Sequence, residues 1–266
     1  MRGAKNITSA DNPFFKELQK FVSSSSHRRK AGQALLDGIH LVQSALDNGH
    51  MPLHFLVTEA AEQNQEVAGL LKKIPDVPRT QLKESLFAQL SELKSPSGLL
   101  ALIAQPQPQA QFKVSAAHSQ FCLLLEDIQD PGNVGSIFRS AAAAGCDAVF
   151  LSPGCADAWS PKVLRAGMGG HFALNIYESV DLIAVATAFE GRIFATSLKA
   201  SKSLFKCDLN GRIAFAAGNE GAGLSAQLLA AAAQNVKIPM FGKIESLNVA
   251  ASIAICLFES VRQRTQ

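Results

Sequence analysis

The stretch FCLLLEDIQDPGNVGSIFRSAAAAG (residues 121–145) passes from an apolar run through a polar turn into a helical pattern. Its opening residues are almost continuously apolar, which is typical of a strand buried on both faces of a parallel sheet. Asp130, Pro131 and Gly132 then break the strand. Gly145 is placed to end the helix, because glycine adopts a positive φ at little cost. This strand–turn–helix unit predicts an α/β fold.

The same alternation continues to the end of the chain. A helix is expected over residues 225–233, and a closing helix runs from Glu245 to about Arg264. The closing helix is apolar on nearly every side in its middle, which predicts a buried helix. On residue pattern alone, this order predicts an open, Rossmann-like sheet with helices on both faces. The expected strands cover residues 121–126, 148–152, 172–178, 191–198, 212–218 and 236–240.

The first part of the chain is a less regular mixture of both patterns. A helix is expected over residues 12–22, and a second runs through Ala45 and ends at Gly49. SSSSHRRKAG (residues 23–32) is interpreted as a polar loop with a small basic cluster. Strand patterns cover residues 53–58 and 98–104.

Proline and glutamine alternate at the start of QPQPQAQFKVSAAHS (residues 105–119). This composition favours an extended, semi-rigid linker over a packed element. We therefore expect a smaller α/β domain over residues 1–104, a linker over 105–119 and a larger domain over 120–266.

Composition restricts the class of protein. With 47% hydrophobic residues in 266, the chain has ample core material, and its net charge of +3 permits a nucleic-acid partner without requiring one. The start lacks the apolar core of a signal peptide, and no apolar run approaches the roughly 18 residues of a membrane span. The odd number of cysteines and the lack of metal-ligand spacings predict a reduced cytoplasmic protein without metal or membrane. The cysteines are Cys122, Cys146, Cys155, Cys207 and Cys256.

Polar turns follow three of the expected strands. They are the turn at 130–133, AAGNEGAGLS (residues 216–225) and the loop inside IPMFGKIESLNVAASIAICLFE (residues 238–259). Ligand sites of α/β proteins form at the carboxyl ends of strands, so the three turns predict one composite site. The glycine order of the second turn does not match the dinucleotide fingerprint GxGxxG, which disfavours a nicotinamide dehydrogenase.

Each of these turns also has a purely structural interpretation. Asn133 suits a helix cap, and Arg139 suits a surface side chain with a buried stem. Ser246 is the best candidate for capping the closing helix. Asn248 is harder to explain in this way, since asparagine is a poor helix former and its amide needs a partner.

Together, the three segments resemble the three motifs of the SpoU/TrmH family of RNA ribose 2′-O-methyltransferases, within the SPOUT superfamily. The resemblance covers about residues 121–262 and includes the strings NxGxxxR and GNEGxGLS. The N-terminal half is similar to the family's substrate-binding extension and to RNA-binding ribosomal proteins of the L30e type. It shares Ile7-Thr8-Ser9, Asn12-Pro13, Arg28-Arg29-Lys30 and Leu36-Asp37-Gly38, with Asp37 where Glu is more usual.

The resemblance implies a C-terminal α/β trefoil-knot domain with a parallel sheet, preceded by a smaller L30e-like α/β domain. It implies a homodimer with the active site at or near the subunit interface. S-adenosylmethionine would bind, bent, between the second and third motif loops. The substrate would be RNA, with rRNA ahead of tRNA because of the two-domain build. A non-catalytic RNA-binding protein of the same fold is the alternative from another functional class.

The resemblance also assigns roles to residues. The catalytic set is Asn133, Arg139, Glu220, Ser246 and Asn248. The cofactor-binding set is Gly218, Asn219, Gly221, Ile238, Met240 and Leu247. The candidate RNA contacts are Arg28, Arg29 and Lys30, for which a solvated loop is the competing interpretation.

Arg139 is the expected centre of the chemistry. A guanidinium is a poor general base because it stays protonated, so we expect it to act as a donor. It would grip the phosphate beside the ribose and stabilise charge on the ribose oxygen. Glu220 is expected to orient it.

Overall fold

The computed structural model describes residues 5–107 and 111–265, and it divides the chain into two compact units. The first contains residues up to 106 together with 159–172. The second contains residues 107–158 and the remainder from 173. Within the described ranges, no helix has the length and apolar character needed to cross a bilayer.

The first unit is built on a mixed sheet of five strands in the order β1-β4-β3-β5-β2. β1, β4 and β3 are parallel, whereas β5 runs antiparallel to β3 and β2. Strand and helix patterns in this part of the sequence therefore give an α/β unit, as expected. The strands are β1 Lys5–Ile7, β2 Gln33–Asp37, β3 Pro52–Val57, β4 Arg79–Leu82 and β5 Leu99–Ala104.

Six helices flank this sheet in the described sequence up to residue 106. The first has Asn12 as its cap and buries Phe15, Leu18 and Phe21 against the strands. One prediction was wrong: the expected polar loop at 23–32 is mostly helix α2, because Ser24 accepts from His27 N and Gly32 ends the turn at φ 61°. The helices are α1 Pro13–Ser23, α2 Ser25–Ala31, α3 Ile39–Asp47, α4 Glu59–Gln63, α5 Gln65–Lys73 and α6 Glu84–Phe87.

The second unit contains a seven-stranded sheet in the order β10-β12-β9-β11-β6-β7-β8, with every pairing parallel. The six expected strands are confirmed, and the very short β10 was not foreseen. The last expected strand ends earlier than predicted, so Ile238 and Met240 lie in the loop that follows it. The strands are β6 Phe121–Leu125, β7 Ala148–Leu151, β8 Asn175–Tyr177, β9 Arg192–Thr196, β10 Lys202–Ser203, β11 Ile213–Ala217 and β12 Gln234–Lys237.

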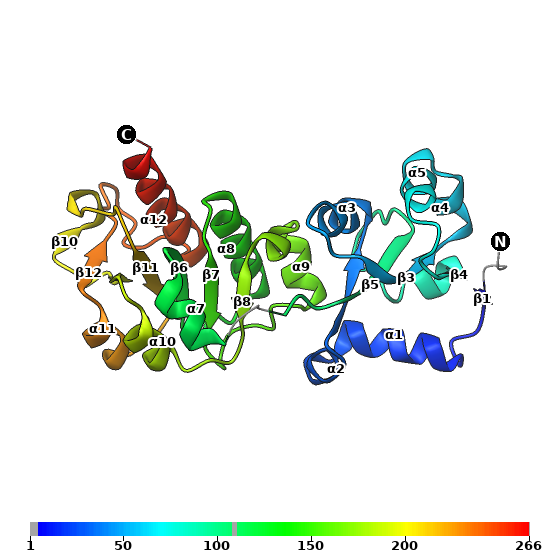
Figure 1. Cartoon of the computed structure of the whole chain (residues 1–266), viewed down its shortest axis with the longest axis horizontal. Helices are drawn as coiled ribbons and strands as arrows, with labels where there is room; N and C mark the ends of the chain where they lie inside the picture. The colour runs from blue at the N-terminus through cyan, green and yellow to red at the C-terminus, as the bar shows by residue number, and fades with distance from the viewer. Residues whose placement is uncertain (1–4, 108–110, 266) are drawn as a thin grey trace. The chain divides into compact units, whose positions relative to one another are not determined.

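Helices cover both faces of this sheet, as the alternating pattern predicted. In Figure 1, α8 and α12 lie on one side, and α7, α10 and α11 lie on the other. Short 3₁₀ turns occupy Gly170–Ala173 and Leu204–Lys206, and α9 (Pro161–Gly167) belongs to the first unit. The helices are α7 Phe112–His118, α8 Pro131–Ala143, α10 Leu182–Ala188, α11 Ala226–Ala231 and α12 Val249–Arg264.

The segment expected to be an unpacked linker contains a packed helix. α7 spans Phe112–His118, and its Ala116 is fully buried with Leu182 and Val185 of α10. The proline–glutamine alternation stops before this point, and Ala116 joins the core of the second unit. The extended composition therefore describes only the beginning of residues 105–119; residues 108–110 lie outside the described ranges.

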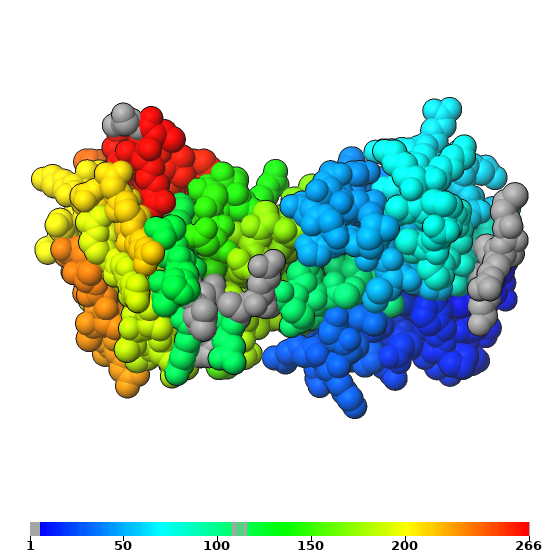
Figure 2. All heavy atoms as spheres, in the orientation of Figure 1, coloured from blue at the N-terminus to red at the C-terminus, as the bar shows by residue number. Residues whose placement is uncertain are grey.

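The closing helix differs from its prediction in two ways. It begins at Val249 rather than Glu245, and it is not buried on every side. It buries Ile253, Cys256 and Leu257, while Phe258 is 47% exposed. Figure 2 shows this helix, in red, at the surface.

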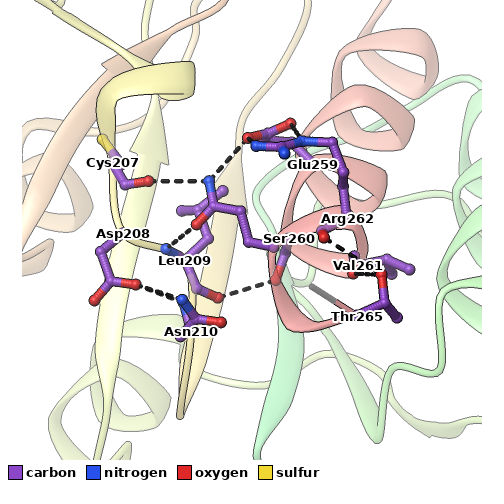
Figure 3. Close-up of polar contacts among 10 residues, drawn as sticks. Cys207, Asp208, Leu209, Asn210, Glu259, Ser260, Val261, Arg262 and Thr265 are labelled. Carbon is purple, nitrogen blue, oxygen red and sulfur yellow. Dashed lines mark hydrogen bonds and ion pairs between the residues drawn. The ribbon is translucent and has the colours of Figure 1, made fainter.

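Side-chain hydrogen bonds anchor the C-terminal end of α12 to residues 207–209 (Figure 3). The buried Ser260 hydroxyl donates to Leu209 O at 3.1 Å. The Gln263 amide accepts from Leu209 N at 2.8 Å and donates to Cys207 O at 3.1 Å. These bonds fix the far end of the helix whose first turn enters the candidate site.

Candidate active site

In the sheet of the second unit, the order in which strands are added reverses at β6. The chain proceeds from β6 to β7 and β8 on one side, whereas β11 pairs with β6 on the other, with Ala217 opposite Leu125. Where the strand order reverses, a crevice forms at the carboxyl ends of the two neighbouring strands, here β6 and β11. The first and second polar turns leave the sheet at these two ends, so they meet there.

Backbone and carboxylate groups join these turns. Glu126 N donates to Ala217 O at 2.9 Å, and the Glu126 carboxylate accepts from Ser225 N at 2.7 Å. Asn219 Nδ2 donates to Asp127 O at 3.1 Å. The glycine-rich second turn is thus attached to the end of β6 at both of its ends.

Asn219 also organises the second turn from within. Its Oδ1 accepts from Gly221 N at 2.9 Å and from Ala222 N at 3.1 Å. A Cβ on Gly218 would collide with the backbone of Gly223, so only glycine fits at this position. Gly218, Asn219 and Gly221, all expected cofactor contacts, therefore shape one tight loop.

One hydrogen-bonded chain connects all three motifs. Asn133 Nδ2 on α8 donates to Glu220 Oε1 at 2.6 Å. Asn248 Nδ2 donates to Asn133 Oδ1 at 2.9 Å. These contacts span 87 and 115 residues of sequence. The three turns, far apart in sequence, therefore meet at one place in the structure.

The caps at the two helix starts determine how these amides are oriented. Asn248 Oδ1 accepts from Ala250 N at 2.9 Å and Ala251 N at 3.3 Å, so its NH₂ group is left to donate. That NH₂ meets the oxygen of Asn133, and the Asn133 NH₂ then faces the Glu220 carboxylate. Each donor therefore meets an acceptor along the series Asn248–Asn133–Glu220.

Two expected caps were assigned to the wrong residue. Asp130 caps α8 by accepting from Asn133 N at 2.7 Å, so Asn133 lies inside the helix with its side chain available. Asn248, not Ser246, caps α12. Ser246 is exposed two residues earlier, in a loop that has not yet become helical. The sequence contained the signal for the first cap, since Asp is as good a cap as Asn and Pro131 follows it.

Arg139 does not pair with Glu220. It lies six residues after Asn133 on α8, about 240° further around the helix, and its side chain is exposed. Within the described ranges, no hydrogen bond or ion pair joins its guanidinium to another residue of the chain. The expectation that Glu220 orients Arg139 was wrong, because Glu220 Oε1 instead accepts from Asn133.

The third loop exposes three apolar side chains, of which the sequence analysis singled out only Leu247. Phe241 is 96% exposed, Ile244 72% and Leu247 40%. Ile238 and Met240, further back in the same loop, are only partly buried. Single exposed apolar residues are ordinary, but these three lie within seven positions of one another beside the polar cluster.

Two family models match this chain. The description of the first is the SpoU rRNA Methylase family, and it covers residues 120–258, more than half of the chain. The chain belongs to the SpoU rRNA methylase family. The second model, an MRM3-like substrate binding domain, matches residues 12–101 of the first unit.

One relative and two solved structures match this SpoU chain over nearly their full length. The 23S rRNA (guanosine(2553)-2′-O)-methyltransferase RlmP of Bacillus subtilis is 32% identical, with 96% of this chain and 98% of that protein covered. A crystal structure of an RNA 2′-O ribose methyltransferase is 31% identical, with a TM-score of 0.83 and coverage of 98% and 100%. The AdoMet-bound rRNA methyltransferase of Sinorhizobium meliloti is 27% identical, with a TM-score of 0.83 and coverage of 97% and 98%.

The basic cluster in the first unit of this SpoU chain is smaller than expected. Arg28 is only 4% exposed, and its guanidinium donates to Phe21 O at 2.6 Å and Val22 O at 3.0 Å. It therefore holds α1 against α2 and is not available to a phosphate. Arg29 and Lys30 are exposed, so they remain candidates for RNA contact.

No cluster of metal-binding side chains accompanies the site. Among the residues described, no group of three or more His, Cys, Asp or Glu is arranged to hold a metal ion. The polar groups of the SpoU site are amides, the carboxylates of Glu126, Asp130 and Glu220, and backbone N–H groups.

Proposed function

We propose that this chain is an S-adenosylmethionine-dependent RNA 2′-O-ribose methyltransferase that acts on ribosomal RNA. The observation that carries the proposal is the hydrogen-bonded chain Glu220–Asn133–Asn248, which joins all three SpoU motifs. The full-length similarity to RlmP of Bacillus subtilis and to the AdoMet-bound enzyme of Sinorhizobium meliloti supports the reaction and the cofactor.

The second and third loops fit the cofactor. Gly218, Asn219 and Gly221 present closely spaced backbone groups, and Ile238, Met240 and Leu247 offer apolar surface that is not fully buried. An adenosyl group has a flat apolar face, which suits the apolar side chains of the third loop. Its polar edges suit the backbone groups of the second loop. S-adenosylmethionine supplies an electrophilic methyl group on a sulfonium.

The protein's own residues have to hold the ribose and manage its proton. The ribose oxygen attacks the methyl carbon as the sulfonium leaves as a neutral thioether, and the hydroxyl proton passes to water. Arg139, exposed and charged, grips the RNA phosphate and stabilises the developing oxyanion. Asn133, Glu220 and Asn248 hold α8 against both cofactor loops. Ser246 lies in the ribose-facing part of the third loop. Correct alignment of the three reacting atoms supplies much of the rate.

We further propose that the protein is a homodimer with a trefoil knot and that it acts in the cytoplasm. The exposed side of α12, with Phe258, provides a face that a second copy would cover in a homodimer. The third segment would form the passage of a trefoil knot between β12 and α12. A cytoplasmic location is part of the proposal, and five cysteines that are all free thiols suit a reducing compartment. Sedimentation of the purified protein tests the dimer: a mass of one chain at micromolar concentration contradicts it.

Substituting Arg139 tests the mechanism. Arg139→Ala should lower methyl transfer at saturating RNA by at least about 10²-fold, the usual loss on removing a donor to a developing oxyanion. Affinity for S-adenosylhomocysteine should change less than about twofold, because the proposed cofactor contacts are in other loops. Lys20→Ala, at an exposed helical cation paired with Glu17, is the control. Normal turnover of Arg139→Ala removes Arg139 from the mechanism.

The substrate is tested by mapping 2′-O-methyl groups in rRNA and tRNA from cells with and without the gene. Loss of one mark in large-subunit rRNA is expected. Loss of a tRNA mark alone transfers the proposal to tRNA. Full retention of every mark, with no transfer by purified protein, supports a non-catalytic RNA-binding protein.

A further inference from the structure

A glycine in the first unit has no structural explanation. Gly69 lies in the middle of α5, where glycine destabilises a helix relative to alanine. Its φ is not in the left-handed region, and a Cβ at this position would meet no atom within 4 Å. Neither backbone conformation nor packing against a neighbour therefore requires a glycine here.

This glycine lines a cleft between α3 and α5 of about 210 Å³. Ile39 and Leu70, 8% and 4% exposed, form an apolar floor. His40 and Gln43 from α3, with Gln65 from α5, add polar groups around it. Both helices lie on the face of the first unit that Figure 2 shows, α3 in blue and α5 in cyan.

The polar groups around the cleft suit a small planar ligand with donors and acceptors at its edge. Gln43 Nε2 donates to Asp47 Oδ1 at 2.7 Å, which leaves the Gln43 carbonyl oxygen as an acceptor. Glu66 adds a carboxylate, and Lys73 places a cation in the last turn of α5. A cleft of this size is smaller than pockets for drug-sized molecules, so it fits a single ring system.

We propose that this cleft binds one unpaired base of the RNA substrate, with its flat face over the backbone at Gly69 and its phosphate near Lys73. This inference rests on the proposed function, since RNA is the substrate that offers such a group. Bases of single-stranded RNA are splayed out and bound face-on and at their edges, which needs apolar floor and polar rim together. The missing side chain at position 69 provides the space for the base.

Filling the cleft tests the proposal. Gly69→Leu places a side chain in open space and removes the helix penalty of glycine, so the thermal midpoint should not fall. Gly69→Ala is the intermediate filling variant, with the same helix benefit and only one added methyl. Gly69→Gln is a second filling variant, in case leucine reduces solubility. The probe is large-subunit rRNA lacking the methyl mark, with KM, kcat and filter-binding Kd measured for each variant.

The expected result is a rise of about tenfold in RNA KM and Kd for Leu and Gln, the size of one lost base contact. For both filling variants, kcat at saturating RNA and affinity for S-adenosylhomocysteine should stay within about twofold of wild type. Gly69→Ala, with one methyl in the same space, should show a smaller rise in RNA KM and Kd than Leu or Gln. Folded Leu and Gln variants with unchanged RNA Kd overturn the cleft proposal while leaving the methyltransferase proposal intact. A wild type that binds rRNA but transfers no methyl group overturns the proposed function, and Kd then still decides the cleft.

Discussion

Asn133 occupies the central position in the site because an amide both donates and accepts. Its NH₂ group donates to Glu220, and its oxygen accepts from Asn248. A carboxylate accepts only, and a hydroxyl has one proton and a shorter reach. Glutamine would carry the same groups on a longer stem. Among the twenty side chains, asparagine therefore best joins an acidic residue and a second amide at this spacing.

Asn133→Asp should be more harmful than Asn133→Ala. The aspartate places a second carboxylate beside Glu220 at hydrogen-bond distance, a repulsion of about 1–2 kcal/mol at a partly exposed site, or on the order of tenfold in rate. Lower pH should partly restore the Asp variant, since the two carboxylates can then share one proton. Single-turnover methyl transfer between pH 6 and 8 measures this. Equal rates for Asp and Ala at pH 8 contradict the assigned contact.

At the scale of elements, α12 links two distant parts of the second unit. Asn248 caps it in the site, and Ser260 and Gln263 attach its other end to residues 207–209 (Figure 3). A helix is a rigid rod along its axis, so anchoring at one end limits movement at the other. The position of Asn248 therefore depends on contacts made at the other end of the 16-residue helix.

Removing the Asn248 cap should destabilise the protein. Asn248→Ala loses two bonds to the first turn of α12, and a lost cap costs about 1 kcal/mol. The expected shift is roughly 2–4 °C in the thermal midpoint. Ser246→Ala, two residues earlier and exposed, should shift it by less than about 1 °C. Thermal unfolding by circular dichroism distinguishes them, and a larger loss for Ser246→Ala places the helix start where the sequence alone had predicted it.

At the scale of the molecule, the charges available to RNA in the first unit depend on burial. Arg29 and Lys30 are exposed, whereas the neighbouring Arg28 is enclosed by backbone carbonyls. Arg28 therefore has a structural role, whereas Arg29 and Lys30 are free to contact a phosphate.

Arg29→Ala/Lys30→Ala should weaken rRNA binding and reduce the slope of log K against log salt by about 1–2, one unit or slightly less for each lost phosphate contact. Arg28→Ala should instead lower the thermal midpoint, because it removes bonds that join α1 to α2. Filter binding between 50 and 200 mM salt measures the slope. An unchanged slope in the double variant excludes these two residues as phosphate contacts.

Buried thiols make the folded protein sensitive to alkali. Burial raises the pKa of Cys122 and Cys146, and it raises the pKa of Cys256 to about 12. Thiols in the unfolded chain ionise near pH 9.0, so above that pH the unfolded state releases protons that the native state retains. The contribution of these thiols to the free energy of unfolding should therefore be constant well below pH 9 and fall as pH rises towards 12. Urea unfolding from pH 8 to 10.5 should show a smaller fall for Cys256→Ala than for wild type; equal slopes contradict the assignment.

Much of the fold was predictable because its signals are local. The apolar run at 121–125, the alanine-rich helix after Pro131 and the glycine at 145 each determine their own conformation. Caps were less predictable, since Asp130 and Asn133, or Ser246 and Asn248, are equally suitable by residue type. The helix at 112–118 was missed because its contact with Leu182 and Val185 comes from a distant segment.

The sequence by itself determined the strand-and-helix order, the three polar turns and the family to which they belong. Only the tertiary structure decided which groups in those turns meet. Glu220 contacts Asn133 rather than Arg139, Asn248 caps the last helix, and Arg28 is buried while Arg29 is not. The physical reason is that turns and helices follow from neighbouring residues, whereas hydrogen-bond partners 87 or 115 residues apart depend on how the parallel sheet places the ends of β6, β11 and β12.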